Sequence, residues 1–465
     1  MDSIEKRLLM KNEMTRRELL RLLSAAGLGA AFASRTVADE AGSAPKTAAV
    51  PEGKLVHVAA RPRYPATLVN GKVIQPERPL PVNQETDVLV VGGGPAGFAA
   101  AVAAARAGVK TTLVERYGYF GGQWTGGLVL LVISTHAKEN GQLVKVMRGI
   151  GDELLERLTS INGAVVNQTP GKFNPTSDPE ATKFMMDEMI REAGVKVVLH
   201  CWAVDVVMEG STLRGIVFES KAGRQAVLAK VVVDATGDGD IFAAAGAEHE
   251  QRLHAIGLVH RLGNTDRADL AQLKAAGIKS LGSVEPLTSV KWINLRGPST
   301  DALDIAELTR LEMEHRRSIW KRVQQLRKTP GGEALYLLQT APQLGVRITR
   351  LLAANKQLTY AEAMAGTKFA DTIGVGGAQS AQHRGWPIPY GALVPKKLDN
   401  LLAAGRCICV DEKLIEDMRL IAPCLTTGHA AGAAAALAVQ NNCRPREVDI
   451  PKLQQLLRSQ GAYLG

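Results

Sequence analysis

Three glycines and one glutamate between Asp87 and Glu115 have the types and spacing that bind a dinucleotide. Gly92, Gly94 and Gly97 fall at G-x-G-x-x-G spacing. Such glycines allow a tight turn, an approach of bare backbone to a pyrophosphate, and close packing of a helix on a strand. Glu115 follows Gly97 after 17 intervening residues, where a carboxylate can accept both ribose hydroxyls of an adenine dinucleotide. The combination predicts dinucleotide binding, although the glycine spacing alone is weak evidence.

A strand, a helix and a second strand must position these residues. Val88 to Val91 is a short apolar run, typical of a buried parallel strand. Pro95 is tolerated in the first turn of the helix that follows, and Gly108 stands where a left-handed residue would end it. The second strand begins at Lys110 and ends at Glu115.

Further along the chain, glycines and short apolar runs predict more of the same site. The loop 116–127 contains so many glycines that its backbone is expected to wrap a flat ligand, the alternative being an ordinary glycine-rich loop. Four β runs, at 197–200, 203–207, 213–218 and 226–233, predict a three-stranded meander inserted in a doubly wound sheet. The last run leads into Ala235-Thr236-Gly237 and is expected to return beside the first glycine turn.

Helices are predicted at 181–193, 301–328 and 423–439. Gly194 would end the first, and Ser299 or Thr300 would cap the second. The third is crowded with glycine and alanine, so its backbone can press against the sheet and the cofactor. Its N-terminus is placed around 426–429, where it would present free N–H groups and a partial positive charge. A plain packing helix is the alternative.

With these motifs in hand, the chain resembles the FAD-dependent oxidoreductase family of the two-dinucleotide-binding-domain flavoproteins, from about residue 65 to the C-terminus. The resemblance implies that Gly92, Gly94 and Gly97 meet the FAD pyrophosphate and Glu115 the adenosine ribose. It implies that Ala203 or Val204 flanks the adenine. The motifs that carry it are 91–97, Glu115-Arg116, Gly121-Gly122, Thr125-Gly126, 234–240, 345–350, Gly405-Arg406-Cys407 and 428–432. The predicted FAD-binding residues are Gly92, Gly94, Ala96, Gly97, Glu115, Arg116, Gly121, Gly122, Thr125, Val204, Thr236, Gly237, Gly405, Arg406, Gly428 and Ala431.

The predicted fold class is α/β, a doubly wound Rossmann-like FAD-binding domain with an inserted β-meander and a helical or mixed cap domain for substrate. The FAD-binding domain is expected to comprise 85–130, 196–245 and 386–465. The cap is expected to comprise 131–195 and 246–385.

Candidate catalytic residues lie in the last third of the chain. Arg347 and Arg419 are candidates for holding a carboxylate or carbonyl substrate bidentately. His383 or Tyr390 is a candidate for moving a proton, and Arg350 is a further candidate. For each, a structural role in tying loops together is the alternative.

Two positions depart from the family's motif, Ile348 in place of Glu and Leu351 in place of Arg, and both are expected to face the substrate. Nothing resembles a Ser-His-Asp set, a metal cluster or a P-loop.

The first 38 residues resemble a Tat leader. Arg16-Arg17 precedes an apolar, small-residue segment, Leu22 to Ala33, which is too short for a comfortable membrane span. The Tat route exports folded proteins, so a cofactor could be loaded before export. The alternative is an amphipathic helix that happens to contain Arg-Arg. Residues 39–84 form a proline-rich arm with a hairpin signal at Val69-Asn-Gly-Lys72.

Charge and cysteine content restrict which other classes of protein the chain can belong to. The formal net charge is +10 over 465 residues, and residues 1–38 carry seven Lys or Arg against four Asp or Glu. The rest is therefore +7, without a basic, aromatic run for nucleic acid. Five scattered cysteines do not make a disulfide framework. Cys407-Ile-Cys409 is interpreted as buried thiols in a strand-like run, with a metal or redox pair as the alternative.

The sequence as a whole predicts an exported oxidoreductase with non-covalent FAD. Its partners are expected to be a small-molecule substrate and a separate electron donor or acceptor, with no nucleic acid and no stable membrane span. Two alternatives stay open at this point. One is an NAD(P)-dependent dehydrogenase on the same fold, which would leave Gly121-Gly122 and the C-terminal glycine helix without a role. The other is a non-catalytic flavin-binding protein.

Overall fold

The computed structural model describes residues 64–165, 174–377 and 384–465. The predicted leader and His383 therefore lie outside the described residues. The chain divides into two compact units, Met1–Arg78 and Pro79–Gly465. In the first, strands β1 (Thr67–Val69) and β2 (Lys72–Ile74) form an antiparallel hairpin. Asn70 and Gly71 take φ angles of 49° and 76°, as a two-residue primed turn requires, so the predicted hairpin is confirmed.

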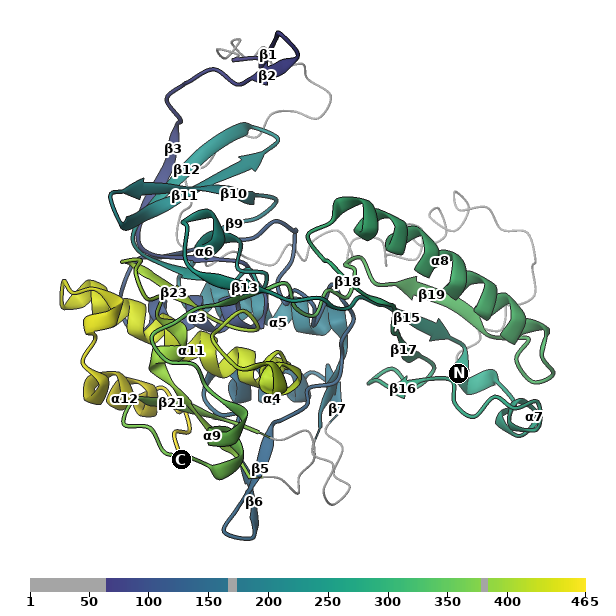
Figure 1. The fold of residues 1–465 in the computed structure, drawn as a ribbon. Helices are drawn as coiled ribbons and strands as arrows, with labels where there is room; N and C mark the ends of the chain where they lie inside the picture. The colour runs from purple at the N-terminus through teal and green to yellow at the C-terminus, as the bar shows by residue number, and fades with distance from the viewer. Residues whose placement is uncertain (1–63, 166–173, 378–383) are drawn as a thin grey trace, which may run out of the picture. The chain divides into compact units, whose positions relative to one another are not determined.

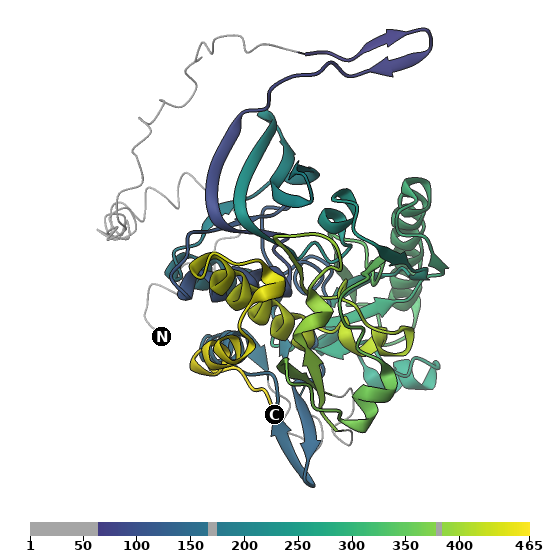
Figure 2. The same cartoon turned by 60° about the vertical axis from the view of Figure 1, so that its left-hand side comes forward.

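A seven-stranded sheet organises the second unit. Its order is β10-β11-β12-β3-β4-β9, with β23 also paired to β12. The long strand β12 is antiparallel to β11 over its first half and parallel to β3 and β23 over its second (Figure 2). This confirms both the predicted meander and the return beside the first glycine turn. The strands are β3 (Val82–Val91), β4 (Thr111–Val114), β9 (Lys196–Val198), β10 (Trp202–Glu209), β11 (Thr212–Ser220), β12 (Gly223–Asp234) and β23 (Leu401–Ala403).

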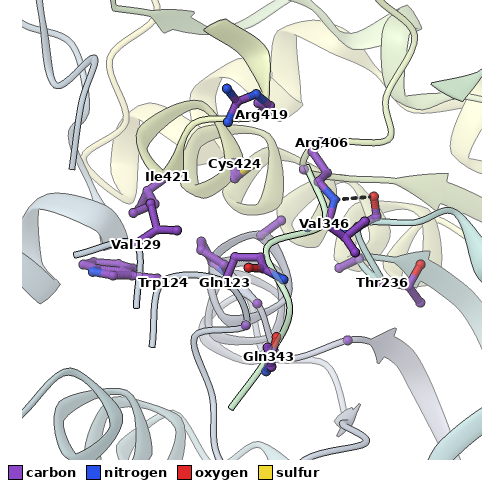
Figure 3. A pocket seen from close by; sticks show the side chains of 18 of the residues that line it. Gln123, Trp124, Val129, Thr236, Gln343, Val346, Arg406, Arg419, Ile421 and Cys424 are labelled. Carbon is purple, nitrogen blue, oxygen red and sulfur yellow. Dashed lines mark hydrogen bonds between the residues drawn. The ribbon is translucent and has the colours of Figure 1, made fainter. Parts of the chain in front are cut away.

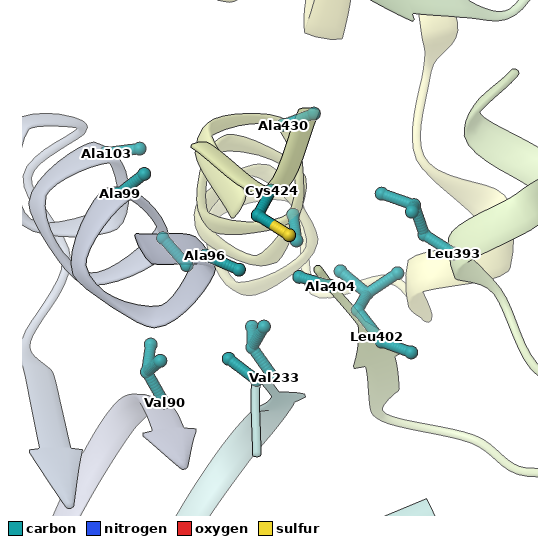
Figure 4. Packing of buried hydrophobic residues seen from close by; sticks show 14 of the residues in the cluster. Val90, Ala96, Ala99, Ala103, Val233, Leu393, Leu402, Ala404, Cys424 and Ala430 are labelled. Carbon is teal, nitrogen blue, oxygen red and sulfur yellow. The ribbon is translucent and has the colours of Figure 1, made fainter. Parts of the chain in front are cut away.

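Two helices pack together on this sheet at close range. They are α3 (Pro95–Arg106) and α11 (Ile421–Gln440), and Figure 4 shows the alanines of α3 facing α11 above Val90 and Val233. A Cβ added at Gly428 would lie 2.0 Å from Ala96 O, and one at Gly432 would lie 2.1 Å from Ala100 O. These glycines, one helical turn apart, therefore allow the two helix backbones to touch. The glycines were expected to let this helix press against the sheet and the cofactor, whereas Gly428 and Gly432 let it press against α3.

The start of α11 differs from the prediction. Leu420 is the N-cap, in an extended conformation, and the helix begins at Ile421. The N-terminus predicted from the sequence, around 426–429, lies one to two helical turns later. Pro423 fits there because a first-turn residue needs no N–H partner. The free N–H groups consequently belong to the residues just after Leu420, and Thr426 to His429 lie inside the helix. Among the described residues, α11 is the one helix long and apolar enough to cross a bilayer, and 89% of its apolar window is buried inside the protein.

The cap is smaller than predicted. Its separate hydrophobic cluster is drawn from Leu128 and Leu130 and from residues 256–344. The helices α4 (Ile150–Ser160) and α5 (Pro179–Glu192) instead bury their apolar faces in the main core, with α3. Strands β21 (Thr372–Gly376) and β22 (Trp386–Pro389) likewise contribute to that core. Among the described residues, 132–165, 174–195, 353–377 and 384–385 thus belong with the predicted FAD-binding part, because their apolar side chains complete its core.

In the cap, a four-stranded antiparallel sheet of order β16-β17-β15-β19 is covered by α8 (Figure 1). The helix α8 (Ile305–Lys328) is capped by Asp304, whose side chain accepts from the N–H groups of Ala306 and Glu307. Ser299 and Thr300, the predicted caps, form strand β18 instead. The cap strands are β15 (Leu258–Gly263), β16 (Ser283–Val284), β17 (Lys291–Leu295) and β19 (Tyr336–Thr340).

The remaining elements connect these layers. They are β5 (His136–Glu139), β6 (Gln142–Lys145), β7 (Ala164–Val165), β8 (Thr176–Ser177), α6 (Asp240–Ala244), β13 (His249–Gln251), β14 (His254–Ala255), α7 (Leu270–Ala275), β18 (Ser299–Thr300), β20 (Arg350–Leu352), α9 (Tyr360–Ala365), α10 (Ile415–Met418) and α12 (Ile450–Ser459). Cys407 and Cys409 are buried, unpaired thiols, as interpreted, but they lie in a turn and not in a strand.

Candidate functional site

A cavity of about 430 Å³ runs from the first glycine turn to the cap. Residues from both ends of the chain line it, as Figure 3 shows for Gln123 and Val129 on one side and Arg406 and Arg419 on the other. Val259 of β15 and Trp292 and Asn294 of β17 line it from the cap. The cavity therefore lies where the FAD-binding part and the cap meet.

The glycine turn forms an open cradle at one end of this cavity. Gly92 has a φ of +98°, and a Cβ on Gly97 would lie 1.7 Å from Gly92 O. A Cβ on Gly94, by contrast, would have no atom of the described part of the chain within 4 Å, and Gly94 lines the cavity. Helix α3 starts here, and its first hydrogen bond runs from Phe98 N to Gly94 O. The preceding N–H groups of α3 have no acceptor within the helix, so the cradle suits a pyrophosphate.

Glu115 lies at the end of β4 and is buried, with 6% of its surface exposed. Its carboxylate accepts hydrogen bonds from Gly93 N (2.5 Å) and Tyr117 N (2.9 Å). Burial raises the pKa of this carboxyl, and the two backbone donors oppose that rise. These bonds fix the carboxylate between the glycine turn and the loop after β4, where it lines the cavity.

The turn after β12 is held by a fully buried carboxylate. Asp234 accepts from Thr236 N and Oγ1 (3.1 and 2.7 Å) and from the N–H groups of Ile241 and Phe242 (3.0 and 2.9 Å). Burial raises its pKa to about 6 against these donors. The bonds join the predicted Thr236-Gly237 turn to the start of α6 and place both of these residues in the cavity wall.

Arg406 fixes the opposite side of the same turn. Its Nε donates to Gly237 O (2.8 Å), and its Nη2 lies 2.6 Å from Asp238 Oδ1 (Figure 3). Burial lowers the pKa of the guanidinium, but the Asp238 carboxylate outweighs this and holds the pKa above its ordinary value. Arg406 and Gly405 both line the cavity.

An aromatic and cationic cluster lies at the adenine end expected from the resemblance. The Arg116 guanidinium lies 4.8 Å from the ring centroid of Tyr117 and 5.7 Å from that of Trp202. All three residues line the cavity together with Ala203. Of the two residues that the resemblance offered beside the adenine, Ala203 lines the cavity, whereas Val204 does not and is 42% exposed. Because side chains alternate along a strand, a shift of one residue on β10 turns the side chain away.

The cap end of the cavity is polar and cationic. Arg347 Nη1 donates to Ala255 O (2.6 Å), and Arg347 Nη2 lies 3.4 Å from Asn294 Oδ1. Glu416 pairs with Arg419 and also lies 2.5 Å from His254 Nε2. Arg296 completes the set, and all of these except Ala255 line the cavity. The structure thus brings Arg347 and Arg419 together, as substrate binding would require.

Two predicted catalytic residues lie elsewhere. Arg350 pairs with Asp240 Oδ1 (3.0 Å) and bonds Asp238 O, away from the lining. Tyr390 is buried, and its hydroxyl donates to Pro445 O (2.8 Å). Burial also raises its pKa far above the ordinary value. The structure therefore gives Arg350 and Tyr390 structural contacts and brings neither to the cavity.

The two positions that depart from the family motif do not face the substrate. Ile348 and Leu351 are 2% and 3% exposed and belong to the main hydrophobic core. Their apolar side chains pack in that core, so the expectation that they face the substrate was wrong.

Several predicted cofactor residues support the site without lining it. Gly121 N donates to Gly93 O (2.8 Å), and Thr125 Oγ1 donates to Phe120 O (2.5 Å), which closes the loop after β4. Gly97, Gly428 and Ala431 lie in the buried contact between α3 and its neighbours. The predicted residues in the lining are Gly92, Gly94, Ala96, Glu115, Arg116, Gly122, Thr236, Gly237, Gly405 and Arg406.

Sequence reasoning missed Trp202, His254, Arg296 and Glu416, which all line the cavity. His254 and Arg296 lie on the cap side, in a stretch without a motif. The tryptophan just before the predicted meander is a signal that could have been used, because aromatic side chains stack on bases.

Parts of this chain are similar in sequence to known proteins. A thiamine thiazole synthase of Methanococcus vannielii is 32% identical over 164 residues, which are 33% of this chain and 56% of the synthase. A thiamine thiazole synthase of Metallosphaera sedula is 29% identical over 239 residues, 47% of this chain and 79% of that one. The chain thus spans only 56% of the length of the first relative.

Two further comparisons concern the whole chain. A geranylgeranyl bacteriochlorophyll reductase-like protein of Thermoplasma acidophilum superposes with a TM-score of 0.42 at 14% identity, over 82% of this chain and 84% of that one. The sequence model of the family described as "FAD dependent oxidoreductase" matches residues 87–257 and 260–457. Because this match covers most of the chain, the protein belongs to the FAD-dependent oxidoreductase family, is an enzyme, and has FAD as its cofactor.

Proposed function

We propose that this enzyme is exported and moves hydride or electrons between bound FAD and a small organic substrate held at the cap end of the cavity. The observation that carries the proposal is the continuity of one cavity from the glycine cradle to Arg347 and Arg419. A cofactor at one end and a polar substrate wall at the other can then share one space that is closed by the cap.

The lining residues fit FAD. The open cradle at Gly94 and the first turn of α3 would hold the pyrophosphate, and Glu115 the ribose. Arg406 would hold the turn at Thr236-Gly237 against the cofactor. When bound, FAD supplies the hydride or electron transfer itself.

The protein's own residues would orient the substrate and exclude water. Apolar side chains, among them Val129, Leu131 and Val346, line the middle of the cavity. The start of α11 at Leu420 and Ile421 also lines it, so the partial positive charge of that helix end faces the reaction space. Membership of the family favours this arrangement over the nicotinamide alternative.

Export is proposed on the twin arginine, Arg16-Arg17, and the apolar segment that follows it. We expect cells making the full chain to contain a yellow protein in the periplasmic fraction, with a flavin that is released on denaturation. The variant Arg16→Lys, Arg17→Lys should carry the same flavin but stay in the cytoplasm. The measurement is the visible spectrum of each fraction before and after denaturation.

The outcomes separate the two halves of the proposal. A protein without colour that also fails to take up added FAD would contradict flavin chemistry. A yellow protein that stays in the cytoplasm with its twin arginine intact would contradict export alone. Bleaching of the flavin by an added substrate, followed by recovery with an electron acceptor, would support turnover.

Trp202 offers a separate test of where the adenine lies. We expect Trp202→Ala to raise the dissociation constant of FAD about fivefold, because stacking on an indole contributes ~1 kcal/mol. The side chain is 57% exposed, so the unfolding free energy of the apoprotein should change by only about 0.5 kcal/mol. FAD titration of the apoprotein by calorimetry measures the first, and urea unfolding the second. Trp320→Ala, on the exposed face of α8, is the control and should leave FAD affinity unchanged.

A further inference from the structure

We infer that the cap end of the cavity is an anion site that binds the carboxylate group of a small organic acid. Arg347 and Arg419 would be its main ligands, and Arg296 would add a third positive charge. The inference rests on the proposed function, since it names the class of substrate for the same cavity.

The first support is the number of donors that the protein leaves unused. A guanidinium carries five N–H groups. Arg347 uses one in a short bond to Ala255 O, and its contact with Asn294 Oδ1 is long, at 3.4 Å. Arg419 uses Nη2 on Glu416, and its buried Nε has no partner among the described residues. Two planar donor groups with spare N–H bonds therefore border the same cavity.

The second support is the imbalance of charge. Three guanidinium groups, of Arg296, Arg347 and Arg419, line this end, and Glu416 is the carboxylate among them. The three guanidinium groups therefore outnumber this carboxylate by two charges, without counting His254. Burial, together with repulsion from Arg419 and Arg296, lowers the pKa of Arg347. Like charges held this close destabilise the empty site, and an anion would relieve the repulsion.

The third support is the rigid frame behind the arginines. Arg419 follows α10, and Glu416 on that helix also pairs with His254 of β14. Arg347 is tied to the next residue of the same strand, Ala255. The cap side and the C-terminal segment thus hold the two arginines by shared contacts, so little side-chain freedom would be lost on binding.

A carboxylate fits this site better than a phosphate. Planar guanidinium groups bind a carboxylate or a phosphate with two parallel bonds, so the surroundings of the arginines decide between the two anions. The neighbouring cavity wall is apolar, with Val129, Val346 and Trp292, which suits the carbon part of an organic acid. Inorganic phosphate would bring additional oxygens towards that apolar wall, where burying them without partners is unfavourable.

The test titrates the FAD-loaded enzyme with acetate, succinate and benzoate at constant ionic strength. Acetamide, succinamide and benzamide are the neutral partners, and inorganic phosphate is the competing anion. Calorimetry and the visible difference spectrum of the flavin report binding. We expect saturable binding of at least one carboxylate, about tenfold weaker binding of its amide, and weaker binding of phosphate.

Variants locate the binding. Arg347→Gln and Arg419→Gln should each weaken the carboxylate about tenfold while the flavin content and the spectrum of the free enzyme stay the same. Arg327→Gln, on the exposed end of α8, is the matched control and should bind as the native enzyme does. An FAD-loaded enzyme that binds none of the carboxylates, binds amides or phosphate as tightly, or is unaffected by both substitutions would overturn the inference. A chain that fails to hold FAD would contradict the proposed function instead.

Discussion

Replacing Gly97 with alanine is expected to abolish FAD binding and to lower the free energy of unfolding by about 3 kcal/mol or more. The added methyl group would lie 1.7 Å from Gly92 O and 3.2 Å from the Ala235 side chain. The closest contact is with the backbone of a tight turn, so no side chain can move aside. The helix α3 would have to separate from β3 and β12, and both the core and the cradle depend on that contact.

Gly94→Ala is the matched variant, three residues away. The φ of Gly94 is −66°, and a methyl group there meets no atom of the described residues within 4 Å, so the apoprotein should keep its stability within about 0.5 kcal/mol. The methyl group would nevertheless project into the cradle, and FAD affinity should fall by tenfold or more, about 1.4 kcal/mol. Urea unfolding and FAD titration measure the two quantities on both variants. Equal behaviour of the two variants would show that this explanation of the glycine spacing is incorrect.

The FAD-binding half of this fold could be predicted because its signals are local. Apolar runs, glycines at fixed spacing and turn residues act within a few positions of themselves, and they placed β3, α3, β4 and the meander correctly. The hairpin turn at Asn70-Gly71 is of the same kind. At the glycines and turn residues, backbone conformation alone restricts which residues are allowed.

The parts that could not be predicted depend on contacts between distant segments. The segment that contains helices α4 and α5 was predicted to belong to the cap, yet the leucines and methionines of these helices complete the main core. Arg350 and Arg347 lie three residues apart in one motif, but one pairs with Asp240 and the other borders the cavity. Their local sequence does not indicate which arginine borders the cavity, because this depends on which segment of the chain packs against each one.

The polar cluster under the cap illustrates the same point. His254 and Glu416 are 162 positions apart and meet at 2.5 Å. Three histidines of this region, His249, His254 and His260, have no ligand spacing, and only the fold assigns one of them to the cavity. A cluster assembled from long-range contacts leaves no periodic signal along the chain.

Lowering the pH from 7 to 4 is expected to destabilise the protein through His429, a histidine buried inside α11. His429 is 3% exposed, and its Nε2 lies 2.7 Å from Gln460 Oε1. Burial lowers its pKa from 6.5 to about 4, against the bond to Gln460. The unfolded chain therefore takes up a proton below pH 6.5, whereas the folded chain resists protonation until about pH 4. The stabilisation is complete at pH 7 and is lost as the pH falls through this window, by about 2 kcal/mol at pH 5 and about 3 kcal/mol at pH 4.

His429→Gln tests this assignment, because glutamine can still donate to Gln460 but does not titrate. The difference in unfolding free energy between pH 7 and pH 5, measured in urea, should be about 2 kcal/mol smaller in the variant than in the native chain. His260, 1% exposed and with its pKa also lowered to about 4, mainly by burial, should keep a second, similar dependence in both proteins. His200→Asn exchanges an exposed histidine at a φ of 58° that asparagine tolerates, and it should retain the native pH profile. If His429→Gln retained that profile as well, the acid sensitivity would have to come from another group, such as His260 or His136, whose pKa burial also lowers, or from the loss of FAD. A contribution from FAD would disappear when the measurement is repeated on the apoprotein.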